Sequence, residues 1–334
     1  MTDRRRRLEE EIEVKIARTM LGVSGVLALA AGLAACSEEG PSEAGDGDAQ
    51  GGNVESVGLM LQDISNPFFA SMQNTMEELA EQEGFSLNVQ DGRQDLAEQN
   101  SQIDAFIQQD VDLIIINAVD SDGIGSAIER AKEAGIPVVA VDVDAEGADA
   151  AVTTDNVEAG RMACTALAER IGGSGEILIL EGTPTTAPRE RVEGCEEVLG
   201  NDFPEIEVVG KQATTNDRAT GLEVATDLLT ANPDVDGIFA LNDPVALGAD
   251  LALQQANIDG VVIVGVDGSP EAVEAMNSGN TALWATPAQD PGGMVEQAYY
   301  VGVGLAQGEA PDSRLTLLDP SLVTLDDVSE YGGW

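Results

Sequence analysis

The chain has 334 residues and carries 61 Asp and Glu against 16 Lys and Arg, a formal net charge of −45. Such a surface repels nucleic acids and anionic lipid surfaces, so no nucleic acid is expected as a partner. His is absent, which excludes Ser-His-Asp and Cys-His catalysis within this chain. We expect no enzyme, although the composition leaves carboxylate or Lys chemistry open. The acid-rich, Lys-poor composition resembles that of proteins from halophilic organisms, in which salt screens self-repulsion.

The first 35 residues are typical of an export signal. Residues 20–35 form a short apolar run that ends in small residues and follows Lys15 and Arg18. The sequence LAAC, which ends at Cys36, resembles the lipobox of bacterial lipoproteins, in which the signal is removed before a lipid-bearing Cys. We therefore expect a signal peptide over 1–35 and lipid on Cys36. The alternative is an ordinary signal peptide with an incidental Cys.

Two features surround this expected signal. Residues 9–13, EEEIE, are too acidic for the start of a signal peptide, so translation starting downstream, near Val14, stays open. Residues 37–53 are rich in Gly, Ser and acidic side chains and contain almost nothing apolar, which indicates a flexible linker. We expect residues 36–53 to tether a globular part to a membrane.

From residue 54 the pattern changes to short apolar runs that alternate with longer amphipathic stretches. Examples of the apolar runs are VDLIIIN at 111–117, PVVAVD at 137–142 and VVIVGVD at 261–267. Strands that alternate with helices of 10–15 residues indicate a parallel sheet with helices on both faces. More than ten such strands exceed one compact sheet. The predicted fold class is therefore α/β, with two Rossmann-like, doubly wound parallel-sheet lobes.

Several predicted helices begin with a polar residue followed by Pro, a combination favoured at the first helical position. These steps are Asn66-Pro67, Asp243-Pro244, Ser269-Pro270 and Asp290-Pro291. The first of them is followed directly by Phe68 and Phe69, in a chain with only 6 Phe. Adjacent helical residues point about 100° apart, so the two rings are either core or one of them lines a ligand site.

Polar residues also follow four of the apolar strands. They are Asn117, Asp142, Asn242 and Asp267. Each alone is explained by helix capping or turn formation. Four at equivalent places favour a polar cleft, because ligands bind beyond the carboxyl ends of parallel strands. Planar polar side chains suit neighbouring hydroxyls, and a Phe ring suits the C–H face of a sugar, so the sequence predicts a carbohydrate site.

Residues 54–325 resemble the periplasmic sugar-binding proteins of ABC transporters, of the ribose/galactose type (type I periplasmic binding proteins). The motifs that carry the resemblance include SNPFF at 65–69, TTDN at 153–156, PRERVEG at 188–194 and AQDP at 288–291. It implies two lobes joined by a three-strand hinge, with a sugar in the cleft. By this analogy lobe 1 is 54–155 plus 290–319, and lobe 2 is 156–289 plus 320–334.

The resemblance implies nine ligand-binding residues. They are Asn66, Phe68, Phe69, Asn117, Asp142, Arg189, Asn242, Asp267 and Gln289. Two positions depart from the ribose pattern: Val143 stands where ribose binders carry Arg, and Asn216 where they carry an aromatic residue. The segment before AQDP contains Trp284, which either replaces the lost stacking or belongs to the core.

The implied function is that of an extracytoplasmic substrate-binding lipoprotein. It would bind a monosaccharide, a ribose-like pentose or a hexose, and deliver it to the permease subunits of an ABC importer as a monomer. A polyol, autoinducer or nucleoside ligand, or a chemoreceptor as a further partner, stays open. A repressor with the same core is disfavoured because a signal peptide occupies the place of its DNA-binding helices. No cofactor or metal is expected; the loop that begins at Asp142 resembles a calcium loop but has Thr153 where Glu is needed.

Cys164 and Cys195 remain in the mature domain once Cys36 carries lipid. Both fall on predicted helices that flank the strand at 176–181, and an exported protein is in an oxidising compartment. We predict a disulfide between them, against the alternative of two small buried thiols.

Overall fold

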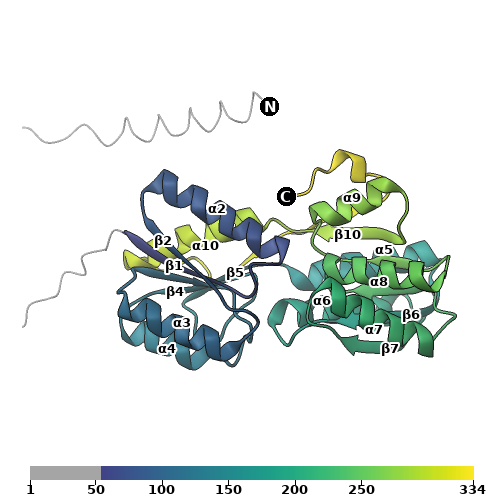
Figure 1. Cartoon of the computed structure of the whole chain (residues 1–334), viewed down its shortest axis with the longest axis horizontal. Helices are drawn as coiled ribbons and strands as arrows, with labels where there is room; N and C mark the ends of the chain where they lie inside the picture. The colour runs from purple at the N-terminus through teal and green to yellow at the C-terminus, as the bar shows by residue number, and fades with distance from the viewer. Residues whose placement is uncertain (1–53) are drawn as a thin grey trace, which may run out of the picture. The chain divides into compact units, whose positions relative to one another are not determined.

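The computed structural model describes residues 54–334, so the predicted signal peptide, Cys36 and the linker lie outside the described residues. Two α/β lobes, each built around a six-stranded sheet, make up this part (Figure 1). The elements of lobe 1 are β1 (Ser56–Leu61), α2 (Pro67–Glu83), β2 (Ser86–Asp91), α3 (Leu96–Gln108), β3 (Leu113–Ile116), α4 (Gly125–Glu133), β4 (Val138–Val141), β5 (Ala150–Thr154), α10 (Pro291–Ala306) and β11 (Leu315–Leu318).

Lobe 2 repeats the same alternation. Its elements are α5 (Asn156–Ile171), β6 (Ser174–Glu181), α6 (Thr186–Asp202), β7 (Glu205–Ala213), α7 (Arg218–Ala231), β8 (Gly237–Ala240), α8 (Asp243–Ala256), β9 (Val262–Val264), α9 (Pro270–Ser278), β10 (Leu283–Ala288), β12 (Ser321–Thr324) and the short 3₁₀ helix η1 (Val328–Glu330).

The two sheets have equivalent strand orders. The first is β11-β5-β4-β3-β1-β2 and the second is β12-β10-β9-β8-β6-β7. All pairings are parallel except that of β10 with β12. In each sheet the strand order reverses beside the first strand of the lobe, which is the topological switch point where α/β sheets bind ligands. The predicted fold class is confirmed.

Helices cover both faces of each sheet, as the apolar strands require (Figure 1). In β3, Leu113 and Ile115 pack in the cluster beneath α2 and α10, while Ile114 and Ile116 pack beneath α3 and α4. In lobe 2, α5 and α6 cover one face and α7, α8 and α9 the other. A strand buried on both faces needs apolar residues at every position, which explains the unbroken run at 113–116.

The four polar-residue–Pro steps begin helices, as predicted. Asn66, Ser269 and Asp290 each accept a hydrogen bond from a backbone N–H of the first turn, in α2, α9 and α10. In α8 the cap is Asn242, one residue before the Asp243-Pro244 step, and Asp243 is the first residue of the helix. These caps satisfy donors that a helix leaves without an internal partner. They also fix the start of each helix at the carboxyl edge of the sheets, beside the strand-end residues.

The chain passes between the two sheets three times: between β5 and α5, between β10 and α10, and between β11 and β12. Thr154 at the first crossing donates a 2.7 Å hydrogen bond from Oγ1 to Oε1 of Gln289 at the second. Both side chains are buried. The crossings therefore run next to one another, where a hinge between the lobes would lie.

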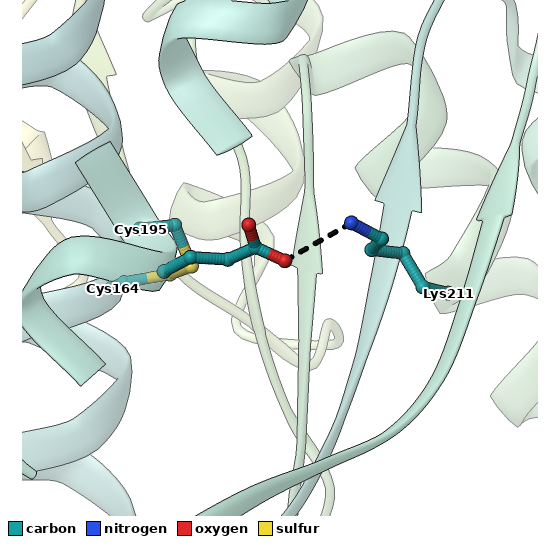
Figure 2. The surroundings of a disulfide bond; sticks show 4 residues. Cys164, Cys195 and Lys211 are labelled. Atoms are coloured by element: carbon teal, nitrogen blue, oxygen red, sulfur yellow. Dashed lines mark hydrogen bonds and ion pairs between the residues drawn. A yellow bond between two sulfur atoms is a disulfide. The ribbon is translucent and has the colours of Figure 1, made fainter. Parts of the chain in front are cut away.

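Two helices of lobe 2, α5 and α6, are joined covalently. Figure 2 shows the disulfide between Cys164 of α5 and Cys195 of α6, whose Cα atoms are 5.1 Å apart. Beside it, Nζ of Lys211 pairs with Oε1 of Glu196 at 3.0 Å.

Within residues 54–334, no helix is long and apolar enough to span a membrane.

Candidate functional site

A cavity lies between the lobes at the carboxyl edges of both sheets. The space between its lining atoms, counted out into the solvent at its opening, is about 390 Å³. The residues that line it are Gln62, Asn66, Phe68, Phe69, Asp142, Val143, Thr185, Ala187, Pro188, Arg191, Asn216, Leu241, Asn242, Asp267 and Gln289. Seven of the nine residues expected at the site are among them.

The start of α2 supplies the aromatic part of the wall. Phe68 and Phe69 are 5% and 7% exposed, and their rings meet edge to face with centroids 5.6 Å apart. Both rings also belong to the apolar cluster of lobe 1. The sequence left open whether these rings belong to the core or to the site. Each ring does both, because it packs against the core and borders the cavity. Oδ1 of Asn66 caps the helix through Phe68 N, and its Nδ2 has no protein partner among residues 54–334.

Asp142, directly after β4, supplies a carboxylate to the same wall. Its Oδ2 accepts a 2.9 Å hydrogen bond from Nδ2 of Asn117, and its backbone φ is 66°, which few residues other than Gly adopt. Burial raises the pKa of Asp142 from 3.8 to about 6, against the charge of Arg191 and the Asn117 hydrogen bond. Strained, buried carboxyl groups with a displaced pKa are typical of functional sites.

Gln62, at the end of β1, contributes a buried acceptor. Its Nε2 donates to the carbonyl of Ala118 at 2.9 Å. Its Oε1 is buried with no hydrogen-bond partner in the described part of the chain. An unpaired buried carbonyl oxygen costs free energy, which a hydroxyl or amine of a ligand would offset.

The opposite wall, from lobe 2, is organised around Arg191 of α6. Its Nε donates to Oδ1 of Asn156 at 2.8 Å, and its Nη1 donates to the carbonyl of Leu241 at 3.0 Å. Nη1 also lies 3.5 Å from Oδ1 of Asp267, and both of these side chains are about 5% exposed. The guanidinium is thus fixed on three sides, which pre-orients its remaining donors.

Asp267, after β9, is the second carboxylate of the cavity. Its Oδ1 accepts a 2.8 Å hydrogen bond from Nε2 of Gln289, and its φ of 144° lies in a region that non-Gly residues rarely adopt. Burial raises the pKa of Asp267 well above its ordinary value; the Arg191 charge opposes the rise, and buried Asp243 adds to it. Burial also raises the pKa of Asp243.

Two expected ligand residues lie elsewhere. Arg189 does not line the cavity: its side chain is 52% exposed and lies 3.8 Å from Asp122 across the lobes. The prediction placed the wrong arginine of PRER in the cavity, because residues two apart on a helix point about 200° apart. Arg191 occupies the inward position. Asn117 is fully buried behind Asp142 and orients that carboxylate without lining the cavity.

The sequence contained a signal for Arg191 that the motif comparison missed. On α6 the buried residues include Pro188, Val192, Cys195 and Leu199, and Arg191 falls on this apolar face. A charged residue on a buried helical face needs a partner, and so indicates a site. Gln62 and Thr185 carried no comparable signal.

Trp284 does not supply stacking in the cavity. Its ring lies in lobe 2 under the guanidinium of Arg170, 4.1 Å from the ring centroid. The two departures from the ribose pattern, Val143 and Asn216, both line the cavity. Among residues 54–334, no group of three or more Asp, Glu or Cys side chains is placed to hold a metal.

The match to known families agrees with this geometry. Residues 57–310 match the family model described as periplasmic binding protein domain. The chain belongs to the periplasmic binding protein family. Membership in this family implies an extracytoplasmic protein.

Curated relatives of this periplasmic binding protein are named as sugar and polyol binders. The chain is 35% identical over 262 residues to the ribose import binding protein of Bacillus subtilis, covering 78% of this chain and 84% of the relative. It is 34% identical over 258 residues to the xylitol-binding protein of Mycolicibacterium smegmatis, covering 76% and 71%. Both relatives are binding proteins, so the expectation that this protein is not an enzyme is confirmed.

Solved structures of the family have the same fold. One is an ABC transporter periplasmic solute binding protein from Actinobacillus succinogenes with bound D-allose. It superimposes with a TM-score of 0.76 and 30% sequence identity, covering 83% of this chain and 99% of the other. The resemblance recognised in the sequence is thereby confirmed at the level of family and fold.

Proposed function

We propose that this protein binds one small neutral monosaccharide or polyol in the interlobe cavity and delivers it to the permease of an ABC importer. The observation that carries the proposal is the composition of the cavity wall. Two Phe rings from lobe 1 face a wall from lobe 2 with a fixed guanidinium, and carboxylate and amide groups come from both lobes. Rings suit the C–H face of a sugar, and carboxylate and guanidinium groups suit pairs of neighbouring hydroxyls.

Within residues 54–334, lobe 1 offers a ligand two buried acceptors and one free donor, Nδ2 of Asn66. Asp142 and the unpaired Oε1 of Gln62 are acceptors, and Val143 beside them is apolar. The donors of Arg191 come from the other lobe. A compact ligand with hydroxyls on both sides meets these demands. Ring and open-chain polyhydroxyl compounds both qualify, so pentoses, hexoses and polyols are the candidates.

Isothermal titration calorimetry of the purified domain tests the proposal. D-ribose, D-allose, xylitol and myo-inositol serve as probes and adenosine as the nucleoside alternative, in high salt to screen the net charge. We expect saturable binding of at least one sugar or polyol at one site, with the compound recovered unchanged. Absence of binding across this panel, or chemical conversion of a probe, would count against the proposal.

We also propose that the mature protein is anchored by lipid on Cys36 and works in a salt-rich environment. The LAAC sequence supports the anchor, and the charge of −45 supports the environment. Cys36→Ser should release the protein from the membrane fraction or block processing. Unchanged fractionation together with unchanged processing of the variant contradicts the anchor, and full stability without added salt contradicts the adaptation to salt.

A further inference from the structure

The segment after η1 leaves lobe 2 and ends against lobe 1. Val328 and Tyr331 pack in the apolar cluster of lobe 2 that α7, α8 and α9 cover. Trp334 instead packs against the cluster of lobe 1 that contains Phe68. Residues 328–334 thus form a connection between the lobes in addition to the three covalent crossings. The resemblance to the family places this tail, within 320–334, in lobe 2 alone.

Trp334 makes two contacts, one on each side of the cleft. Its Nε1 donates a 2.8 Å hydrogen bond to the backbone carbonyl of Asp267 in lobe 2. Its ring meets that of Phe68 in lobe 1 edge to face, with centroids 5.6 Å apart and planes at 87°. Both partners line the cavity, while Trp334 itself does not. It therefore contacts two cavity-lining residues at once without lining the cavity itself.

We propose that Trp334 is a positioning residue of the binding site, which holds Phe68 against the cavity and favours the arrangement in which the lobes are together. The proposal rests on the function proposed above. The two contacts can be made together only when Phe68 and Asp267 are close, so they stabilise the closed arrangement over an open one. A contact that differs between two states shifts the population between them and thereby changes the apparent affinity.

The hydrogen bond and the aromatic contact can be separated by substitution. Trp334→Phe retains a ring beside Phe68 and removes the N–H donor, whereas Trp334→Ala removes both. An aromatic pair and a single hydrogen bond are each modest contributions. We expect affinity to fall about tenfold in Trp334→Ala, equivalent to about 1.4 kcal/mol, and about threefold in Trp334→Phe. The weakening should appear mainly as faster dissociation, since the closed state is the one lost.

The matched control is Trp284→Ala. The chain contains 2 Trp, and Trp284 lies beneath Arg170, outside the cavity. Its loss should leave the affinity at the wild-type value. Replacing it with Phe also leaves Trp334 as the single Trp, so that tryptophan fluorescence then reports the position proposed here. Titration of this variant with D-ribose or xylitol, whichever binds by calorimetry, should change the Trp334 emission.

A measurement without any sugar separates this proposal from the proposed function. Small-angle scattering of the unliganded proteins should give a larger radius of gyration for Trp334→Ala than for wild type, with Trp334→Phe between them. If no probe binds to wild type, the proposed function fails, and the scattering comparison still decides the role of Trp334. Equal radii, or wild-type affinity in Trp334→Ala where a probe does bind, would overturn the inference.

Discussion

Nδ2 of Asn117 donates a 2.9 Å hydrogen bond to Oδ2 of Asp142 from behind the cavity wall. Oδ1 of Asn117 accepts a hydrogen bond from the backbone N–H of Gln62, so the amide cannot rotate freely. The other carboxylate oxygen of Asp142 has no protein partner among the described residues. Asn117 thus fixes the orientation of a carboxylate whose second oxygen remains for a ligand.

The first prediction concerns the stability cost of ionised Asp142. The folded pKa, about 6, lies above the ordinary 3.8, so the folded state holds the proton more tightly. The stabilisation that this proton gives is fully present below about pH 4 and is lost as the pH rises through about 6. Above that pH the ionised group costs on the order of 3 kcal/mol. Asp142→Asn should therefore melt at a higher temperature than wild type at pH 7.5, and the difference should vanish near pH 4.

Asn suits this position because it tolerates a positive φ and can accept from Asn117. The same variant should bind sugar about 10- to 100-fold more weakly, because a charge-assisted hydrogen bond is lost. Asp104→Asn, at an exposed ion pair with Arg130, is the control and should change neither property. A melting difference for Asp142→Asn that is the same at every pH would disprove the burial argument.

The second prediction separates the two arginines of PRER. Arg191→Ala should abolish most sugar affinity and destabilise the unliganded protein, because buried Asp267 then lacks its counter-ion. Arg191→Lys should bind weakly, since an ammonium cannot reproduce the fork that reaches Asn156 and Leu241. Arg189→Ala, at an exposed ion pair, should stay within about threefold of wild type. Calorimetry decides, and a larger loss for Arg189→Ala than for Arg191→Ala would reverse the assignment.

The sequence was sufficient for the features that depend on local pattern. Runs such as 113–116 and caps such as Asn66 are set by near neighbours, so the alternation of strands and helices could be predicted. Asp142 and Asp267 could also be predicted at the site, because the carboxyl ends of parallel strands meet at one edge. The same rule also predicted Asn117 at the site. It does not distinguish a residue that lines the cavity from one that, like Asn117, orients the carboxylate of Asp142.

Other features depend on packing between distant segments. Whether Arg189 or Arg191 faces inward is decided by the rotation of α6, which is fixed by its contact with α5. The path of residues 328–334 from lobe 2 to Phe68 has no periodic signature at all. In the sequence, Gln62 is one polar residue among several that follow strands. That its Oε1 is buried without a partner in the described part of the chain depends on the three-dimensional arrangement and could not be predicted.

The third prediction concerns the disulfide between Cys164 and Cys195. Its sequence separation is 31 residues, and closing such a loop is worth about 3–4 kcal/mol in the chain-entropy model. In a Cys36→Ser background, which leaves only these two Cys, Cys164→Ser/Cys195→Ser should lower the melting temperature. Adding a reductant should shift the parent toward this variant and leave the variant unchanged. Free thiols at both positions in freshly exported protein, detected by mass spectrometry, would rule the bond out.

The last prediction tests how the contact between α5 and α6 positions Arg191. A Cβ added to Gly160 of α5 would overlap the backbone oxygen of Arg191, and one added to Gly194 of α6 would overlap that of Val157. The two helices therefore approach closely at these glycines. Gly160→Ala should push α6 outward at Arg191, cost about 1–3 kcal/mol of unfolding free energy and weaken sugar binding.

Gly200→Ala on α6 is the control, since nothing lies within 4 Å of its added Cβ. It should leave affinity unchanged and stabilise the protein by about 0.5–1 kcal/mol, because Ala favours helix. Chemical denaturation and calorimetry measure both effects. If Gly160→Ala lost stability and kept wild-type affinity, the helix contact would support the fold without setting the position of the guanidinium.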